Sequence, residues 1–205
     1  MSQALVHRTN RQLANSQNIH VLNGVLIVGA SLLMAVCAHV SIPLWFTPVP
    51  ITLQTFGVML LALTLGGWRA SAALVLYLVE GISGLPVFSP SGPGGIAQIL
   101  GPTGGFLMAY PLAALVGGLL LQKLSRSKRP VISFVFGALA CDAIVFAAGA
   151  IWLLGLTHQS SSAIMTAAVL PFLPGEVLKG AAAVGAALAK TARFPQTHAG
   201  LSDEK

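Results

Sequence analysis

Long apolar stretches recur along the chain, separated by short polar segments or by segments rich in Gly and Pro. No Asp, Glu, Lys or Arg occurs between Arg11 and Arg69, or between Glu80 and Lys123. These stretches are rich in Ala, Leu and Gly and do not alternate apolar with polar residues, which favours helices over barrel strands. A helix needs about 20 apolar residues to cross a bilayer. We therefore predict an all-α integral membrane protein with six transmembrane helices, near residues 21–40, 50–67, 70–85, 104–122, 131–154 and 167–189.

The composition agrees with a membrane protein and argues against a soluble one. Charged residues make up 8% of the chain and hydrophobic residues 55%, whereas a soluble domain carries about 25% charged residues. We find no linker or low-complexity tract, so residues 1–205 are expected to form a single membrane domain in contact with the lipid bilayer. The two cysteines, Cys37 and Cys141, lie within predicted helices, where small apolar packing residues are expected.

The basic residues are distributed one-sidedly over the predicted connections. The connections near 41–49, 86–103 and 155–166 contain no Lys or Arg. By the positive-inside rule, the other side is cytoplasmic and both termini lie there. This topology accounts for the net charge of +6 without a nucleic-acid partner. The alternative for the first span is a signal peptide cleaved near Ala38, but its apolar run is too long. The ten basic residues on the cytoplasmic side are Arg8, Arg11, Arg69, Lys123, Arg126, Lys128, Arg129, Lys190, Arg193 and Lys205.

Two of the outer connections have the composition of binding elements. Residues 41–50 combine three prolines with Trp45 and Phe46, and residues 86–105 mix Gly and Pro with apolar side chains. Long ordered loops of this kind are often lids or ligand-binding segments. The run at 101–105 lacks the Lys of a phosphate-binding loop, so we expect no nucleotide site in this chain. No His pair at metal-ligand spacing and no hydrolase motif is present, so no metal, no cofactor and no enzymatic activity are expected.

Three ionisable residues fall inside predicted spans: Asp142, Glu176 and Lys179. Such residues are costly in a bilayer and usually mark a function. Asp142 lies near the middle of its span, and Glu176 and Lys179 are three residues apart and so share one helical face. Two interpretations remain open. The three charges either hold two helices together or line a polar pocket that opens to the outer side.

A pocket of this kind would suit a small ligand with an apolar body and several hydrogen-bonding groups. Carboxylates accept hydrogen bonds, Lys and Tyr donate them, and an amide does both. Gln54 and Tyr77 are candidates to join the three charges, and Trp45 and Phe56 are candidates to cover apolar atoms of the ligand.

Four segments occur in an order that resembles a known family. The sequence is similar to the biotin-specific substrate-binding subunit, or S component, of energy-coupling-factor (ECF) transporters, the BioY family. The similarity covers roughly residues 20–190. The segments are VPITLQTFG at 49–57, YLVEGISGLPVF at 77–88, LGPTGGF at 100–106 and PFLPGEVLK at 171–179.

The resemblance implies a six-helix, multi-pass subunit of the bacterial inner (cytoplasmic) membrane that captures biotin from the outer side. In such transporters a membrane coupling subunit and two cytoplasmic ATPase subunits supply the energy, and only these partners bind ATP. Whether the ATPase module is dispensable is left open. By resemblance Gln54, Tyr77, Asp142 and Lys179 fall at pocket positions, but spacing does not decide which of them meets the ureido ring and which the carboxylate.

S components generally dock on the coupling subunit through small residues at four-residue spacing in the first helix. The nearest match here is Ser31-x-x-x-Ala35, with Ser where Ala is expected, and close helix packing remains feasible. Two other hypotheses compete with the S component. One is a solitary ion-coupled carrier for a small carboxylate-bearing vitamin, with Asp142, Glu176 and Lys179 as a proton relay. The other is a purely structural membrane subunit that binds no ligand.

Overall fold

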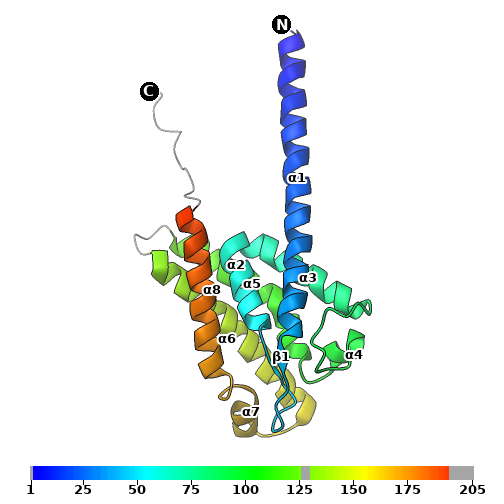
Figure 1. Cartoon of the computed structure of the whole chain (residues 1–205), viewed down its shortest axis with the longest axis vertical. Helices are drawn as coiled ribbons and strands as arrows, with labels where there is room; N and C mark the ends of the chain where they lie inside the picture. Colours follow the sequence, from blue (N-terminus) through cyan, green and yellow to red (C-terminus); the bar gives the residue numbers. More distant parts are fainter. Residues whose placement is uncertain (1, 126–129, 194–205) are drawn as a thin grey trace.

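The computed structural model describes residues 2–125 and 130–193, with side chains from residue 19 onward, and its architecture is all-helical as predicted (Figure 1). A two-stranded antiparallel hairpin, β1 (Ser41–Ile42) and β2 (Ile51–Thr52), pairs Ser41 with Thr52 and Ile42 with Ile51. The described residues form eight helices: α1 (Ser2–His39), α2 (Gln54–Leu65), α3 (Gly67–Ile82), α4 (Gly95–Leu100), α5 (Gly104–Leu124), α6 (Pro130–Thr157), α7 (Ser161–Ala168) and α8 (Leu173–Arg193).

Helices α5 and α6 pack most closely, and glycines make this possible. A Cβ atom on Gly117 of α5 would collide with the Cys141 sulfur and the Gly137 carbonyl oxygen of α6. In the same way, a Cβ atom on Gly118 of α5 would collide with the backbone of Gly67, the first residue of α3. Small residues allow such close approach of helices in a membrane. The outward faces of α1, α6 and α8 carry exposed large apolar residues such as Val25, Ile151 and Leu178, which is the pattern expected of surfaces that contact lipid.

In the part of the chain that the structure describes, three helices are long and apolar enough to cross a bilayer: residues Ile19–His39 of α1, and α5 and α6 in full. The pair α7 and α8 makes a fourth candidate, bent by 52°. Helices α2 and α3 are shorter, because the helix is interrupted between them at Gly66. The φ of Gly66 is 82°, a conformation that favours glycine. Four candidates among the described residues therefore match predicted spans, and the count of six remains a prediction.

The structure corrects the predicted helix boundaries and connections. The helix is interrupted within the outer part of the span predicted near 167–189: α7 ends at Ala168 and α8 begins at Leu173. Pro171 and Pro174 lie at this break, and proline cannot donate the backbone hydrogen bond that a continuous helix requires. Two predicted connections also contain helices, α4 and α7. At the other end, α1 begins at Ser2 and its first half projects beyond the bundle (Figure 1).

Candidate binding site

A small pocket lies between the hairpin, the start of α2, and helices α5, α6 and α8. Its free volume of about 40 Å³ has room for only a few water molecules. The free space is therefore much smaller than a vitamin-sized ligand would need. Its lining combines polar groups on two sides with an aromatic wall and consists of Val49, Pro50, Thr52, Gln54, Thr55, Ser89, Gln98, Thr103, Phe106, Leu107, Tyr110, Phe146, Phe172, Glu176 and Lys179.

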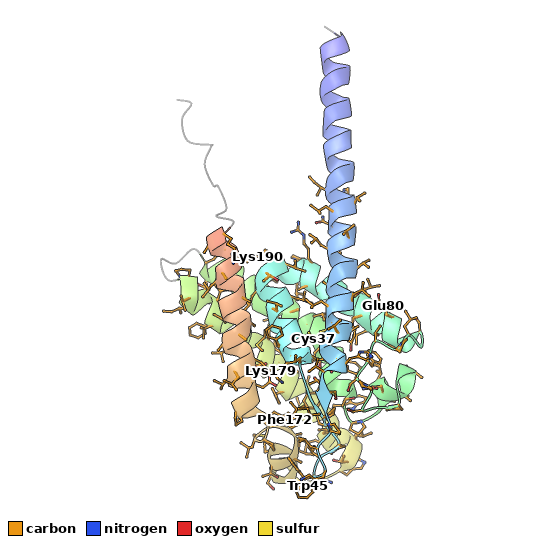
Figure 2. All side chains as sticks on the ribbon, viewed as in Figure 1. Cys37, Trp45, Glu80, Phe172, Lys179 and Lys190 are labelled. Atoms are coloured by element: carbon orange, nitrogen blue, oxygen red, sulfur yellow. The ribbon has the colours of Figure 1, made fainter. Side chains whose placement is uncertain are left out.

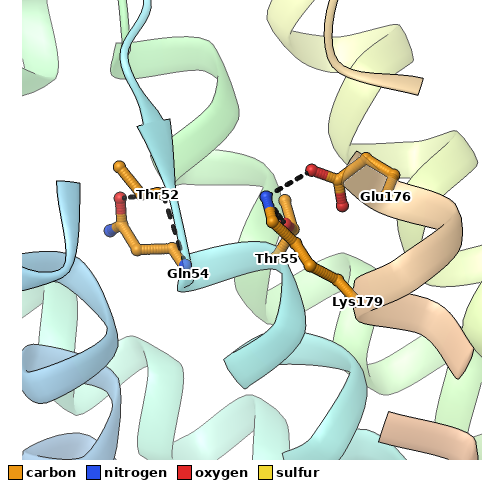
Figure 3. Close-up of polar contacts among 5 residues, drawn as sticks. All are labelled: Thr52, Gln54, Thr55, Glu176 and Lys179. Carbon is orange, nitrogen blue, oxygen red and sulfur yellow. Dashed lines mark hydrogen bonds and ion pairs between the residues drawn. The ribbon is translucent and has the colours of Figure 1, made fainter. Parts of the chain in front are cut away.

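Lys179 and Glu176 form a buried ion pair on one wall of this pocket. The Lys179 Nζ lies 2.7 Å from the Glu176 Oε1 and also donates to the Thr55 Oγ1 at 3.2 Å (Figure 3). The exposed fractions of the Lys179 and Glu176 side chains are 11% and 5%. The spacing of three residues at the start of α8 places both on one face, as the sequence predicted. Through Thr55 this pair also joins α8 to the first turn of α2.

Gln54 is fixed by a separate set of hydrogen bonds. Its Nε2 donates to the Tyr77 hydroxyl at 2.9 Å, and its Oε1 accepts from the Thr52 hydroxyl at 3.2 Å. Thr52 and Gln54 lie on the β2 side, apart from the group formed by Lys179, Glu176 and Thr55 (Figure 3). The Tyr77 side chain is fully buried, packs edge-on against Phe88 and does not line the pocket. The structure thus places Tyr77 behind Gln54, where it orients the amide.

Asp142 lies behind Glu176 and does not line this pocket. It lines a larger, mostly apolar groove of about 810 Å³ between α6 and α8, which Glu176 and Phe146 also line. The Asp142 and Glu176 carboxyl groups are close enough to interact. The Asp142 Oδ1 and the Glu176 Oε2 are both buried without a hydrogen-bond partner. Glu176 therefore separates the pocket from the groove that contains Asp142.

Neither of the two predicted aromatic residues lines the pocket. Trp45 is 95% exposed at the tip of the hairpin, at the far end of the molecule from Lys190 (Figure 2). Phe56 is half-buried and packs against the core. Instead, Phe146 contacts Phe106 and Phe172, with ring centroids 6.1 and 6.3 Å apart. The sequence analysis missed these three residues, although Phe146 lies one helical turn after Asp142 on α6.

Ser31, predicted to lie in a coupling surface, is an internal contact in this structure. The Ser31 side chain is fully buried, and its Oγ lies 3.1 Å from the Glu80 Oε1 and 3.0 Å from the Val28 carbonyl oxygen. This contact joins α1 to α3, and Ala35 is half-buried. The coupling role of the Ser31–Ala35 pair stays a prediction, but Ser31 does not belong to an exposed face here.

The family model described as the BioY family matches residues 9–196. The chain belongs to the BioY family. It is 36% identical to the biotin transporter BioY of Rhodobacter capsulatus over 76% of this chain and 86% of that one. It is 37% identical to the biotin transporter BioY of Thermotoga maritima, over 72% and 82% of the two chains.

A solved structure also resembles this BioY chain. A crystal structure of the S component for biotin from an ECF-type ABC transporter matches with a TM-score of 0.76 and 27% identity, covering 84% of this chain and 93% of that one. These relatives are transport proteins, so the BioY chain belongs to a family of transporters and not of enzymes. Within the described residues, no three His, Cys, Asp or Glu side chains gather as metal ligands would.

Proposed function

We propose that this BioY chain binds biotin in the pocket between the hairpin and α8 and carries it across the cytoplasmic membrane as the S component of an ECF-type transporter. The single observation that carries the proposal is the Lys179 ammonium, buried in a pocket that also holds the Gln54 amide and an aromatic wall, in a BioY-family chain. Lys179 is the only Lys or Arg among the residues that line this pocket.

The chemistry of biotin fits these groups. Its carboxylate needs a cation, and its ureido ring offers two N–H donors and one carbonyl acceptor. The side-chain amide of Gln54 can both donate and accept hydrogen bonds, and the carboxylate of Glu176, which also lines the pocket, can accept hydrogen bonds from both N–H groups. Phe106, Phe146 and Phe172 can cover the apolar ring and tail. Because the pocket holds only about 40 Å³, its walls must separate when biotin enters.

We further propose six spans with both termini in the cytoplasm, so that the hairpin and the pocket face the outside. Lys190 and Trp45 lie at opposite ends of the bundle, and α1 begins at the Lys190 end (Figure 2). The Lys190 Nζ donates to the Thr64 carbonyl oxygen, near the end of α2. This arrangement supports the positive-inside orientation. Four of the basic residues in that argument, Arg126, Lys128, Arg129 and Lys205, lie outside the described residues.

In this proposal biotin is the ligand and not a cofactor, and ATP is bound only by partner subunits. The partners are a membrane coupling subunit and cytoplasmic ATPase subunits of an ECF module. The sequence contains no GxxxxGK[ST] motif of a phosphate-binding loop, which supports a division of labour between this chain and an ATPase.

Uptake measurements test the proposal against the solitary ion-coupled carrier. We expect a bacterial host without its own biotin transporter to accumulate radiolabelled biotin when it expresses this chain together with an ECF module. Removing the module, or inactivating its ATPase, is expected to lower the initial rate of uptake at least tenfold. An uncoupler added while cellular ATP is maintained should leave the rate unchanged. Full uptake without the module, abolished by the uncoupler, would establish the carrier instead.

A further inference from the structure

The side chain of Gln98, on the short helix α4, is held in one orientation at the pocket. Its Oε1 accepts a hydrogen bond from the Gly94 backbone N–H at 3.1 Å, and the Gln98 backbone N–H donates to the Gly94 carbonyl oxygen at 3.2 Å. Because a backbone N–H can only donate, the amide atom that faces it must be the oxygen and not the nitrogen. The NH2 group of Gln98 therefore points away from Gly94.

A second glycine fixes the position of the same amide. A Cβ atom on Gly92 would lie 2.5 Å from the Gln98 Oε1 and 2.8 Å from its Nε2, so the amide packs directly against the glycine backbone. Any side chain at residue 92 would push the amide out of this place. The connection at residues 86–105, which the sequence predicts to be a binding element, thus positions one amide through two of its glycines.

The NH2 group of Gln98 has no partner among the residues that the structure describes. The residue is 3% exposed and lines the pocket. Gln54 differs, because its Nε2 donates to the Tyr77 hydroxyl and its Oε1 accepts from Thr52. A buried amide donor needs an acceptor. In a pocket that takes up a ligand, an oxygen of the ligand can be that acceptor.

Gln98 and Lys179 line the pocket from opposite sides. Gln98 lies on α4 and Lys179 on α8, and Figure 1 shows these two helices on opposite sides of the bundle. Biotin has acceptor oxygens at both of its ends, a ureido carbonyl at one and a carboxylate at the other. When one of these ends meets Lys179, the other end lies on the α4 side of the pocket.

We propose that Gln98 determines specificity by donating, through its Nε2, to the acceptor oxygen at the end of biotin that lies away from Lys179. This inference rests on the proposed function, because it requires biotin in this pocket. The oxygen is the ureido carbonyl if Lys179 holds the carboxylate, and a carboxylate oxygen if Lys179 holds the ureido carbonyl. The residue that meets Gln98 thus also defines the orientation of the ligand.

The fixed amide selects against ligands that carry a donor at this end. A glutamine amide can usually flip and offer its oxygen instead of its nitrogen. Here a flip would turn the NH2 group toward the Gly94 N–H, so two donors would face each other and the hydrogen bond of 3.1 Å would be lost. A ligand with an N–H or O–H group in place of the oxygen is therefore disfavoured.

Titration of three ligands into the purified full chain tests this contact. The ligands are biotin, 2-iminobiotin, in which an N–H group replaces the ureido oxygen, and biotinol, in which a hydroxyl replaces the carboxylate. We expect Gln98→Met, which keeps the length of the side chain but removes the donor, to raise the Kd for biotin about tenfold. One of the two analogues, the one that lacks the oxygen contacted by Gln98, should bind this variant and the wild-type chain equally well.

Two further variants complete the test. Gly92→Ala leaves Gln98 in the sequence but displaces its amide, so it should raise the Kd for biotin and spare the same analogue. Gln122→Met is the matched control, because Gln122 is exposed near the other end of α5 from the pocket residues Phe106 and Tyr110. It should bind all three ligands as the wild-type chain does.

The outcomes separate this inference from the proposed function. Wild-type protein that does not bind biotin would contradict the proposed function itself. An unchanged Kd for biotin in a folded Gln98→Met variant would overturn only the role of Gln98. An equal rise for all three ligands would also overturn it, because a purely structural role has that effect. If Gln98→Met does not fold, Gln98→Glu takes its place, since its carboxylate still accepts from the Gly94 N–H but cannot donate. The analogue with a donor at the contacted end should then bind more tightly than to the wild-type chain, and a gain for neither analogue would overturn the contact.

Discussion

Replacing Lys179 with Ala is expected to weaken biotin binding by about 100-fold or more. The substitution removes the only cation that lines the pocket and leaves the ligand carboxylate in a buried site without a partner. Breaking a buried ion pair by removing one member costs roughly 3–5 kcal/mol, and about 1.4 kcal/mol corresponds to a tenfold change in Kd. Titration of biotin into the purified variant measures the effect.

Lys190→Ala is the matched control for this prediction, because it removes the same side chain from the same helix. Lys190 lies near the other end of α8, where its Nζ donates to the Thr64 carbonyl oxygen at 2.9 Å in an exposed position. Biotin should bind this variant with the Kd of the wild-type chain. If Lys179→Ala and Lys190→Ala bound biotin equally well, the assignment of the pocket would be wrong even for a biotin-binding chain.

Replacing Gly117 with Val is expected to lower the melting temperature by roughly 6 °C. A Cβ atom at this position would collide with the Cys141 sulfur and the Gly137 carbonyl oxygen on α6, so α5 and α6 would have to separate. Overpacking of this kind costs about 1–3 kcal/mol, and each kcal/mol lowers the melting temperature of a chain of this size by about 2–4 °C. Thermal unfolding in detergent, followed by the loss of monodisperse protein, measures the shift.

Gly155→Val is the control, because Gly155 also lies on α6 and a Cβ atom there would meet nothing within 4 Å. Its melting temperature should stay within about 2 °C of the wild-type value, since valine costs a helix no more than glycine does. Equal shifts in the two variants would mean that general sensitivity of the helices to valine, and not close packing of α5 on α6, sets the stability.

The sequence predicted which helices exist and which carry the charges better than it predicted how they face one another. The spacing of Glu176 and Lys179 fixes their common face, and the structure confirms their contact. For Asp142, hydropathy indicates a depth within the span but not a direction around the helix axis. That direction depends on the packing of α6 against α8, which places Asp142 in the groove behind Glu176.

The direction of a loop and the packing partner of a small residue also depend on the tertiary structure, so the sequence predicted neither. Nothing local in residues 41–50 determines that the hairpin directs Trp45 away from the pocket while Val49 and Pro50 line it. A pattern of small residues in α1 fits close packing against another subunit or against α3, and only the Ser31 contact with Glu80 distinguishes the two. Pro171 and Pro174 account for the break before α8, whereas no residue in the segment before it marks the short helix α7.

The most direct test of the central claim is a titration of biotin into the purified chain alone, without coupling or ATPase subunits. We predict saturable binding of one biotin per chain with a Kd in the micromolar range or tighter, because the groups assigned to the ligand, Gln54, Glu176, Lys179 and the aromatic wall, all belong to this chain. A folded, monodisperse preparation that bound no biotin at micromolar concentrations would contradict the account.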